Sequence, residues 1–359
     1  MRILVSAGEP SGDQRGAEVI SRLQNTEAFG MGGPALAASG MELTADMSEY
    51  AVMGFAEVVS SLPSFLKLEK KLAEEAVRRK ADCILLVDYP GFNMRLGRRL
   101  KRAGFPVIQY VAPQMWAWGS WRVGKLKRSC DLLMTLFRFE EDFFRTRGVN
   151  ASFTGHPLRD RISGNLRPGT ALGLLPGSRA QEVGRLLPEM IEAFRLLREK
   201  GTIRTAMLAV SDHLDRKFYA IAEREPGVTL VNSTGEVLRN SAAALVCSGT
   251  ATLETALYKV PFTVCYRTSA ITYAMAERLV RGVDCIGMAN IVAGTQVAPE
   301  LIQNEATAEN MAASTEKLLK NTSEITGKLE LVRTELGPPD AAGQAAKRIT
   351  TFLRERNET

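Results

Sequence analysis

A succession of short apolar runs separated by helical stretches constrains the fold of this 359-residue chain more than any other feature. The runs do not alternate apolar with polar residues, as expected of strands buried on both faces of a parallel sheet. Helical patterns such as residues 64–80 and 188–200 lie between them, and this β-α-β rhythm predicts an α/β fold. The runs form two series, residues 2–7, 83–88, 107–111 and 131–136 and then residues 172–176, 205–210, 228–231, 242–247 and 262–266.

A segment rich in Gly and Pro, residues 164–169, lies between the two series and is the best candidate for a linker. At roughly 100–200 residues per domain, the chain length also suggests two domains. We therefore predict two doubly wound domains facing a cleft, residues 1–165 and residues 166–340. In open α/β sheets ligands bind at the carboxyl ends of strands, so the loops after the predicted strands are where chemistry is expected.

The net charge of +6 is concentrated in one part of the chain. Residues 60–130 hold 15 Lys and Arg against 5 Asp and Glu, a local charge of +10, and the rest of the chain sums to −4. Such a region suits phosphates, nucleic acid or an anionic membrane surface. The five cysteines form no C-x-x-C pair, the chain has only two histidines, and it has no D-x-D pair, so we expect no metal site.

Two loops of the N-terminal half are candidate binding or catalytic loops. The first contains glycines at a helix start, where free N–H groups favour an anion, although it also fits an ordinary turn capped by Ser11 or Asp13. The second begins at Asp88, whose carboxylate suits a general base toward a sugar hydroxyl or, alternatively, caps the next helix or binds Arg95. The first loop reads Gly8, Glu9, Pro10, Ser11, Gly12 and Asp13, and the second reads Asp88, Tyr89, Pro90, Gly91, Phe92 and Asn93.

Aromatic and apolar residues mark two further segments of this half. Trp116 and Trp118 stand beside Pro and Gly, where they can stack on a sugar ring, border an acyl chain or simply pack in a loop. Residues 52–68 combine large apolar side chains with neighbouring lysines, which suits insertion into a membrane interface or, alternatively, packing inside the domain. The candidate membrane residues are Val58, Val59, Leu62, Phe65 and Leu66.

Two loops of the C-terminal half have the outline of a nucleotide-diphosphate site. Gly177 and Ser178 form a turn after an apolar run and precede Arg179, which can bind a diphosphate bidentately or remain a solvated surface residue. The second loop reads Ser248, Gly249 and Thr250, and Glu254 follows one helical turn later. A carboxylate there can accept the ribose hydroxyls while the helix start receives phosphate, although Ser248 or Thr250 also fits a plain helix cap.

Taken in order, these loops resemble those of the lipid-A-disaccharide synthases, over about residues 3 to 303. The sequence departs from the family pattern at Pro10, where a small residue or Thr is frequent, and at Gly91, where a second acidic residue is common. The matching segments are Gly8-Glu9-x-Ser11-Gly12-Asp13, Ala51-Val52-Met53-Gly54, Asp88-x-Pro90-x-Phe92-Asn93, Trp116-Ala117-Trp118, Gly155-His156, Leu174-Leu175-Pro176-Gly177-Ser178-Arg179-x-x-Glu182-Val183, Ser248-Gly249-Thr250-Ala251-x-Leu253-Glu254 and Asn290-x-x-Ala293-Gly294.

The resemblance implies a glycosyltransferase with two Rossmann-like domains, the GT-B fold. It implies inverting condensation of UDP-2,3-diacylglucosamine with 2,3-diacylglucosamine 1-phosphate, giving a β-1,6-linked disaccharide 1-phosphate and UDP. It also implies a cytoplasmic protein without a cofactor, held peripherally at the inner membrane of a Gram-negative-type bacterium, where it contributes to lipopolysaccharide synthesis. Residues 1–165 then face the acceptor and the membrane, residues 166–340 bind the UDP-sugar, and the final helix within 341–359 packs back on the first domain. A homodimer is compatible with the family.

The same resemblance assigns roles to individual residues. Asp88 becomes the general base, Arg179 the partner of the diphosphate and Glu254 the partner of the ribose. The UDP-sugar set is Gly177, Ser178, Arg179, Glu182, Ser248, Gly249, Thr250, Glu254 and Asn290, and the acceptor set is Gly8, Glu9, Ser11, Gly12, Asp13, Asn93 and Trp116. Two alternatives remain open at this point: another UDP-sugar enzyme of the same fold, such as an epimerase or a peptidoglycan-type transferase, and a non-catalytic basic protein that binds nucleic acid.

Overall fold

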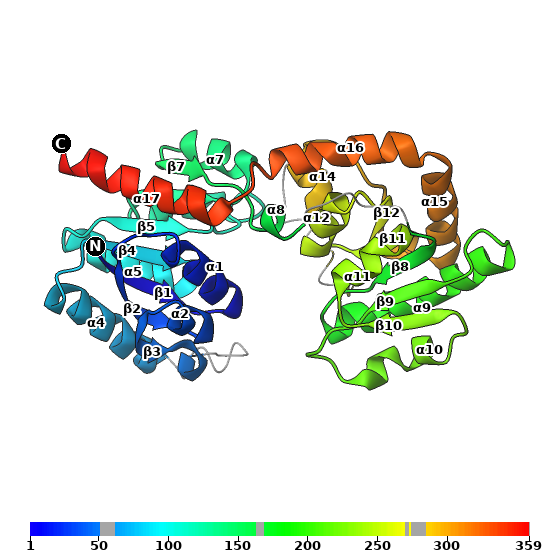
Figure 1. Ribbon diagram of the computed structural model, residues 1–359, viewed down its shortest axis with the longest axis horizontal. Helices are drawn as coiled ribbons and strands as arrows, with labels where there is room; N and C mark the ends of the chain where they lie inside the picture. The colour runs from blue at the N-terminus through cyan, green and yellow to red at the C-terminus, as the bar shows by residue number, and fades with distance from the viewer. Residues whose placement is uncertain (51–61, 163–168, 270–272, 274–284, 359) are drawn as a thin grey trace. The chain divides into compact units, whose positions relative to one another are not determined.

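The computed structural model describes residues 1–50, 62–162, 169–269, 273 and 285–358 (Figure 1). Within these residues the chain divides into two compact units. The N-terminal unit comprises Met1–Asp160 together with Gly337–Thr359, and the C-terminal unit comprises Arg161–Leu336. The chain therefore leaves its first unit, builds the second, and returns to the first for its last helix.

The N-terminal unit is a seven-stranded parallel sheet in the order β3-β2-β1-β4-β5-β6-β7. Its strands are β1 (Arg2–Ala7), β2 (Glu27–Gly32), β3 (Glu42–Asp46), β4 (Cys83–Val87), β5 (Val107–Tyr110), β6 (Leu132–Thr135) and β7 (Ala151–Phe153). Its helices are α1 (Pro10–Ile20), α2 (Pro34–Ala38), α4 (Leu62–Arg78), α5 (Pro90–Arg102), α6 (Val123–Lys127) and α7 (Arg138–Arg145), with 3-10 turns η1 (Met47–Tyr50) and η2 (Ser120–Arg122) and the short α8 (Leu158–Arg161) at the boundary of the units.

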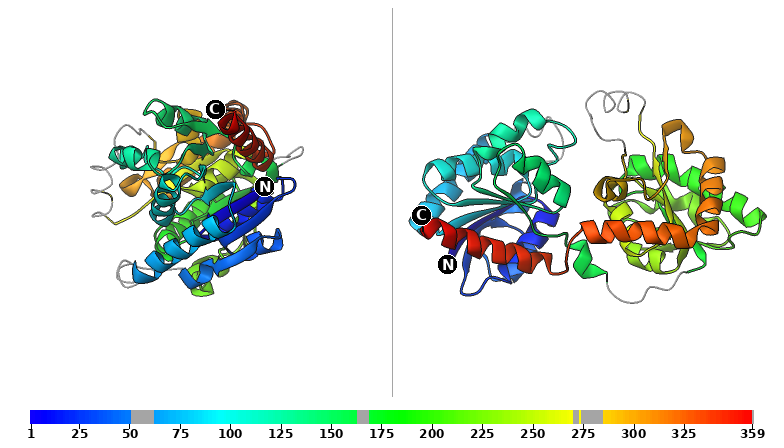
Figure 2. Two further views of the ribbon diagram at one scale, coloured as in Figure 1. Left: turned by 90° about the vertical axis from the view of Figure 1, so that its left-hand side faces the viewer. Right: turned by 90° about the horizontal axis from the view of Figure 1, so that it is seen from above.

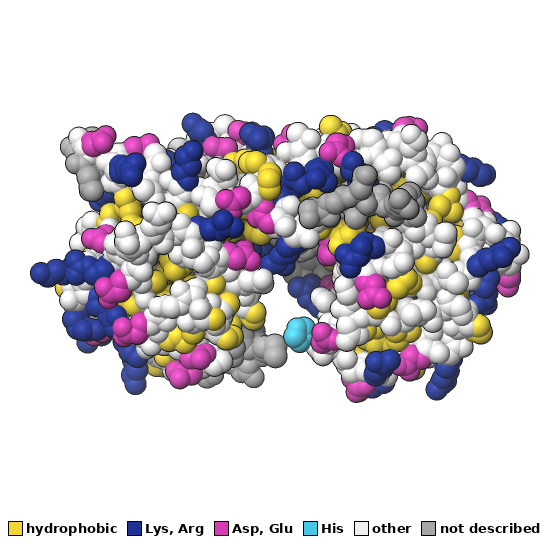
Figure 3. Space-filling model, in the orientation of Figure 1, with side chains coloured by type: hydrophobic (Ala, Val, Ile, Leu, Met, Phe, Trp, Pro, Cys, Tyr) yellow, Lys and Arg dark blue, Asp and Glu magenta, His cyan; other side chains and the backbone are white. Residues whose placement is uncertain are grey.

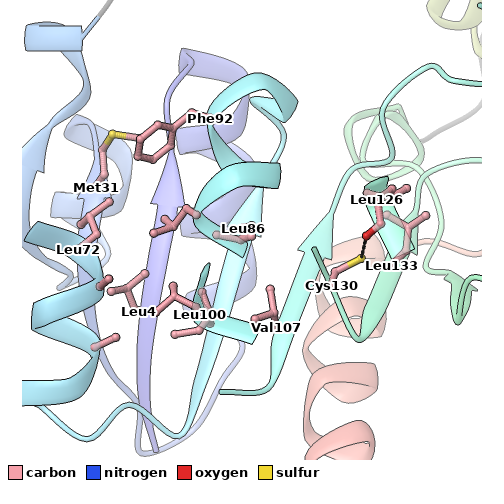
Figure 4. Close-up of a cluster of buried hydrophobic side chains, with 14 of the residues drawn as sticks. Leu4, Met31, Leu72, Leu86, Phe92, Leu100, Val107, Leu126, Cys130 and Leu133 are labelled. Carbon is pink, nitrogen blue, oxygen red and sulfur yellow. Dashed lines mark hydrogen bonds between the residues drawn. The ribbon is translucent and has the colours of Figure 1, made fainter. Parts of the chain in front are cut away.

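Both faces of this sheet are buried, which explains why its strands read as continuous apolar runs. On one face, Leu4 of β1 belongs to a core cluster that includes residues of α4, α5 and α6, while on the other face Ile3 and Val5 belong to a cluster that includes residues of α1 and α2. Figure 4 shows Leu4, Leu86 and Leu100 in the first of these layers. The same close-up includes the Sγ of Cys130, which donates to the backbone oxygen of Leu126 at 3.6 Å.

The C-terminal helix α17 (Ala341–Asn357) belongs to the second of these layers. Ala345, Ile349 and Phe352 on α17 belong to the same core cluster as Ile3 and Val5 of β1, and the helix contacts α1. Figures 1 and 2 both show α17, in red, running along the N-terminal unit. Asp160 accepts hydrogen bonds from the backbone N–H groups of Asp340 and Ala341, which fixes the start of the helix.

The C-terminal unit is a six-stranded parallel sheet in the order β10-β9-β8-β11-β12-β13. Its strands are β8 (Ala171–Leu175), β9 (Ala206–Ala209), β10 (Val228–Val231), β11 (Ser241–Cys247), β12 (Phe262–Tyr266) and β13 (Glu300–Ile302). Its helices are α9 (Ala180–Glu199), α10 (Ala220–Glu223), α11 (Thr234–Arg239), α12 (Thr250–Leu257), α14 (Met288–Ala293), α15 (Ala308–Lys320) and α16 (Thr322–Glu335), with 3-10 turns η3 (Arg216–Tyr219) and η4 (Gln303–Glu305).

The prediction of an α/β fold with two doubly wound parallel sheets is confirmed. The helix predicted at residues 188–200 was wrong at its start, because α9 begins at Ala180 and Pro188 lies inside it. Most of the linker predicted at residues 164–169 lies outside the described residues. The charged region falls in the N-terminal unit, and Figure 3 shows Lys and Arg side chains gathered along the left-hand edge of that unit. In the described part of the chain, no helix is both long and apolar enough to cross a membrane.

Candidate active site

A pocket of about 490 Å³ lies at the carboxyl edge of the C-terminal sheet. From β8 the chain proceeds to β9 on one side, and from β11 it proceeds to β12 on the other side, so the sheet has its topological switch point between β8 and β11. Ligands of open α/β sheets bind at this point. Seven predicted residues line the pocket: Gly177, Ser178, Arg179, Glu182, Ser248, Gly249 and Thr250.

The loop between β8 and α9 exposes a guanidinium at a helix start. Glu182 accepts hydrogen bonds from the backbone N–H groups of Ser178 and Arg179, at 3.2 and 3.3 Å, and from Nη1 of Arg179 at 2.9 Å. Gly177 has a φ of 106° and carries its Cα close to Glu182, so a side chain at this position would be both strained and obstructed. The Arg179 side chain is nevertheless 82% exposed, which leaves its remaining donors open to a ligand.

The loop between β11 and α12 brings a second helix start to the same pocket. Its N-cap residue is Gly249, and neither Ser248 nor Thr250 caps the helix with its side chain, so the simple capping interpretation was wrong. Ser248 instead donates its hydroxyl to the backbone oxygen of Ile286 at 2.8 Å. Apart from its chain neighbours, no atom of the described residues lies within 4 Å of the place that a Cβ of Gly249 would take, so the backbone here is open to the pocket. Two helix starts and one arginine at one pocket suit a diphosphate.

Two residues of the predicted UDP-sugar set lie outside the lining of this pocket. Glu254 is half-buried on α12, where burial raises the pKa of its carboxyl group and the charges of Arg161 and Arg239 lower it. Asn290 is buried, and its side-chain amide is used in the protein: Nδ2 donates to Ala298 and Glu300, while Oδ1 accepts from the N–H groups of Val297 and Ala298. The structure thus gives Asn290 a structural role in holding the loop before β13.

Sequence reasoning missed polar residues that line the opposite side of the pocket. They follow β9 and β10, and Nδ2 of Asn232 donates to Oδ1 of Asp212 at 2.8 Å. The rule applied to the other loops could have found them, because they too come directly after apolar runs that were predicted as strands. The missed lining residues are Ser211, Asp212, His213, Asn232 and Thr234.

The N-terminal sheet has its own switch point, and Asp88 lies there. Strands β1 and β4 are neighbours, with Ala7 opposite Val87, and they continue to β2 and β5 on opposite sides. Nη1 of Arg15 lies 3.5 Å from Oδ2 of Asp88, and the backbone N–H of Tyr89 donates to Oδ1 at 3.0 Å. Asp88 therefore does not bind Arg95 as one alternative proposed; Arg95 pairs with Glu69 on α4.

Glu9, at the end of β1, shares this site with Asp88. Partial burial and the nearby Asp88 carboxylate raise the pKa of Glu9, and Arg15 lowers it. The ring of Tyr89 packs against Gly8 so closely that a Cβ there would lie 2.4 Å from a ring carbon. The end of β1 and the end of β4 are thereby held together around two carboxylates and one guanidinium.

An unusual backbone conformation presents Asp88 to solvent, and Asn93 maintains it. Asp88 and Tyr89 have φ values of 51° and 49°, in the left-handed region that is costly for residues other than Gly. The fully buried amide of Asn93 donates to the backbone oxygens of Ser6, Val87 and Asp88 and accepts from the Ser6 hydroxyl at 2.7 Å. Asn93, predicted to contact the acceptor, thus holds the loop instead.

The remaining acceptor-set residues divide into exposed and structural ones. Ser11 is exposed and Gly12 is buried on α1, whose N-cap is Glu9 without a side-chain cap. The buried carboxylate of Asp13 accepts from the backbone N–H groups of Gly33, Ala35 and Leu36, so it caps α2 rather than its own helix.

Trp116 is tied to a buried carboxyl group. Its Nε1–H donates to Oε1 of Glu140 at 3.1 Å, and its ring meets Phe139 edge-on at 4.9 Å. Burial raises the pKa of Glu140 to about 8, and hydrogen bonds from Trp116 and from the backbone of Phe137 and Leu136 oppose the rise. This pair holds the tryptophan loop against α7.

The buried Glu140 predicts a pH dependence of stability. The pKa of Glu140 in the folded protein lies above its ordinary value of 4.5, so the folded state binds a proton more tightly and stability falls as pH rises from about 4.5 to about 8. We expect the unfolding free energy to lose about 1.4 kcal/mol per pH unit to this group, a loss absent in Glu140→Gln. Urea unfolding at several pH values, followed by tryptophan fluorescence, measures it.

Tryptophan fluorescence is specific here because all three tryptophans lie within residues 116–121 of the N-terminal unit. Asp142→Asn, an exposed change on the same helix, is the matched control and should keep the wild-type slope. If the difference in unfolding free energy between Glu140→Gln and the wild type does not change with pH, Glu140 does not titrate in this range.

The predicted membrane residues are only partly described. Val58 and Val59 lie outside the described residues, and Leu62 is the first residue of α4. Phe65 is half-buried between the rings of Tyr50 and Phe92, with centroids 6.1 and 6.0 Å away, so it packs on the core as the alternative interpretation held. Leu66 is 46% exposed.

Comparison with known families and sequences gives a consistent result. Residues 3–337 match the family model described as lipid-A-disaccharide synthetase. The lipid-A-disaccharide synthase of Myxococcus xanthus is 39% identical over 381 residues, covering 98% of this chain and 97% of that protein. The lipid-A-disaccharide synthase of Syntrophus aciditrophicus is 38% identical over 376 residues, covering 98% of each.

Solved structures resemble the chain in fold. The glycotransferase of kitacinnamycin is 17% identical, with a TM-score of 0.66 and coverage of 98% of this chain and 99% of that one. The UDP-GlcNAc 2-epimerase of Neisseria meningitidis bound to UDP-GlcNAc is 14% identical, with a TM-score of 0.64 and coverage of 99% and 100%. At these identities the similarity establishes the two-domain glycosyltransferase fold and nothing finer.

Proposed function

Since the chain belongs to the lipid-A-disaccharide synthase family of glycosyltransferases, we propose that it joins UDP-2,3-diacylglucosamine to 2,3-diacylglucosamine 1-phosphate. The products are the β-1,6-linked disaccharide 1-phosphate and UDP. The observation that carries this assignment is the pocket at the C-terminal switch point, where two helix starts and Arg179 converge. The predicted membership in this family is confirmed.

In this proposal the C-terminal unit binds the donor. The N–H groups at the starts of α9 and α12 and the guanidinium of Arg179 neutralise the diphosphate, which carries the growing negative charge as UDP leaves. Glu182 orients Arg179 through the hydrogen bond at 2.9 Å. The polar residues after β9 and β10, Asp212 and Asn232 among them, lie where the nucleoside or the sugar would extend. Glu254 as the ribose partner stays a prediction.

The N-terminal unit supplies the base. One oxygen of Asp88 accepts from Tyr89 and the other lies near Arg15, so the carboxylate is anchored at the strand end while 26% of its side chain remains exposed. It takes the proton of the acceptor 6-hydroxyl as that oxygen attacks the anomeric carbon of the donor. The bond from this carbon to the UDP oxygen breaks in the same displacement, and the configuration inverts. One base is sufficient for a single displacement.

Association with a membrane surface is part of the proposal, because both substrates carry acyl chains. The N-terminal unit exposes apolar groups suited to an interface, including Trp118 at 54%, Trp121 at 75% and Leu66 at 46% exposure. Basic side chains accompany these tryptophans, with Arg122 over the ring of Trp118 and Lys125 over the ring of Trp121. We propose peripheral attachment at the inner membrane through this unit; a homodimer stays a prediction.

Product analysis tests the proposed reaction. The purified chain is incubated with both acylated substrates in neutral detergent micelles, and mass spectrometry follows the disaccharide 1-phosphate and UDP. We expect the two products to appear in equal amounts, and only when both substrates are present. UDP release without a disaccharide, or a change in the sugar of the donor alone, would instead indicate a hydrolase or an epimerase of the same fold.

A further inference from the structure

A second pocket, of about 220 Å³, lies in the N-terminal unit and is lined by five cationic side chains. No carboxylate lines it in the part of the chain that the structure describes. Pro90, Gly91 and Met94 of α5 complete the lining. The five cationic residues, here called the basic pocket, are Arg95, Arg98, Arg122, Lys125 and Arg128.

The sequence builds the basic pocket from two helical segments. Arg95 and Arg98 are three residues apart on α5, and Arg122, Lys125 and Arg128 recur every third residue along η2, α6 and its C-cap. Residues at this spacing share one helix face, so each segment presents its charges as a row. The start of α5 at Pro90 and Gly91 also lies at the pocket, and its unpaired N–H groups add partial positive charge.

Most of these charges form no ion pair with any residue that the structure describes. Arg95 shares Glu69 with Arg99, but among the described residues no carboxylate forms an ion pair with Arg98, Arg122, Lys125 or Arg128. Arg122 and Lys125 lie over the rings of Trp118 and Trp121, at 5.7 and 5.3 Å from the centroids, which orients them without cancelling their charge. Like charges gathered in one concavity repel, and a bound anion removes that repulsion.

We propose that the basic pocket binds a phosphate monoester, namely the 1-phosphate of the acceptor sugar. This inference rests on the proposed function. A phosphate monoester offers three acceptor oxygens and close to two negative charges, which matches a pocket whose donors are mostly guanidinium forks. The pocket therefore selects an acceptor that is phosphorylated at C1.

Its position agrees with the chemistry. Pro90, which lines the basic pocket, comes two residues after Asp88, and two residues of chain span at most about 7 Å. A phosphate held at the Pro90 end of the pocket would therefore place the attached sugar on the side of the pocket that is nearest to Asp88. The same phosphate chemistry occurs in the headgroups of anionic lipids, and the experiment below separates these two sources.

The first measurement is steady-state kinetics in neutral detergent micelles with a charge-matched control. The pocket variant, Arg98→Gln with Arg128→Gln, removes two exposed charges that make no ion pair with a described residue. The control variant, Arg102→Gln with Lys127→Gln, removes two exposed charges from α5 and α6 that do not line the pocket. We expect the pocket variant to raise the KM for the phosphorylated acceptor at least about 10-fold at unchanged donor KM, and the control variant to resemble wild type.

The second measurement is binding without turnover. N-acetylglucosamine 1-phosphate should change the fluorescence of the wild type saturably, since two of the three tryptophans, Trp118 and Trp121, lie under cations of the basic pocket. The control variant should respond in the same way, whereas the pocket variant should not, and N-acetylglucosamine without phosphate should have no effect on any of them. The same fluorescence titration is repeated with vesicles of phosphatidylglycerol, which is anionic, and with vesicles of phosphatidylcholine as the control.

Three results would overturn the proposal. Equal losses in the pocket and control variants would point to diffuse attraction by the charged surface. A wild-type response to phosphatidylglycerol but not to the sugar phosphate would assign the pocket to a lipid headgroup. If the pocket variant keeps the wild-type KM for the acceptor and still makes the disaccharide, the proposed reaction stands but the pocket does not bind the acceptor phosphate. The opposite outcome is also possible to detect. If the pocket variant alone loses sugar-phosphate binding, but the wild type makes no disaccharide, then the phosphate site stands and the proposed reaction is refuted.

Discussion

Asp88→Asn is expected to lower kcat at least about 100-fold while the affinity for the UDP-sugar stays unchanged. The amide cannot take the proton of the acceptor hydroxyl, but it preserves the local structure. Asn tolerates the left-handed φ of 51° better than most residues do, and its oxygen can still accept from the Tyr89 N–H. Kinetics with both acylated substrates, together with calorimetric titration of UDP, measure the two quantities separately.

Asp142→Asn is the control for this substitution, because it removes one carboxylate of the N-terminal unit from an exposed position on α7. It should retain wild-type kcat and UDP affinity. Near-normal turnover in Asp88→Asn would remove Asp88 from the role of base. A loss of UDP affinity in Asp88→Asn would instead point to a disturbance beyond the loop at the end of β4.

Arg179→Ala is expected to lower kcat/KM for the donor by about 100-fold or more, comparable to the loss of an oxyanion donor. The guanidinium is 82% exposed at the start of α9 and lines the pocket, so it can meet the diphosphate as negative charge accumulates on the leaving group. Arg179→Lys should recover part of the loss, since it restores the charge but not the bidentate geometry. Donor titrations at saturating acceptor provide the measurement.

Arg224→Ala is the matched control in the same unit. Arg224 is exposed at the C-cap of α10, and in the described structure it forms no ion pair and does not line the pocket. If Arg179→Ala and Arg224→Ala have equal and small effects, the diphosphate does not depend on Arg179. If Arg179→Ala has a lower unfolding midpoint, its loss of activity could come from lost structure. The activity of Arg179→Lys then shows whether the lost charge or the lost structure is the cause.

The fold was largely predictable because the central strands are buried on both faces. The run at residues 2–7 coincides with β1, and the run at residues 262–266 coincides with β12, and both strands are mostly buried. Peripheral strands gave weaker signals: β3 is half polar, β2 contains two glycines, and β7 and β13 have three residues each. Short strands of this kind are defined by pairing with a neighbour more than by their own composition.

For the candidate site, the sequence predicted which residues follow a strand end, and their roles stay a prediction. Asp88 and Arg179 follow β4 and β8 and have partly exposed side chains. Asn93 and Asp13 belong to the same motifs, but their side chains turn inward to bind backbone groups. A sequence motif does not distinguish a side chain that meets a ligand from one that shapes the loop, since the direction of the side chain depends on contacts made with distant segments.

The interrupted N-terminal unit also has a consequence for how the chain is made. During translation, β1 and α1 are synthesised before the second unit, whereas Ile349 and Phe352, which cover the same face of the sheet, are synthesised after it. In the nascent first unit, the apolar strip of the sheet that α17 later covers therefore stays exposed until the whole second unit has been synthesised. A premature stop after residue 336 would release a polypeptide with both sheets present and this strip still bare, a form prone to capture by chaperones or to aggregation.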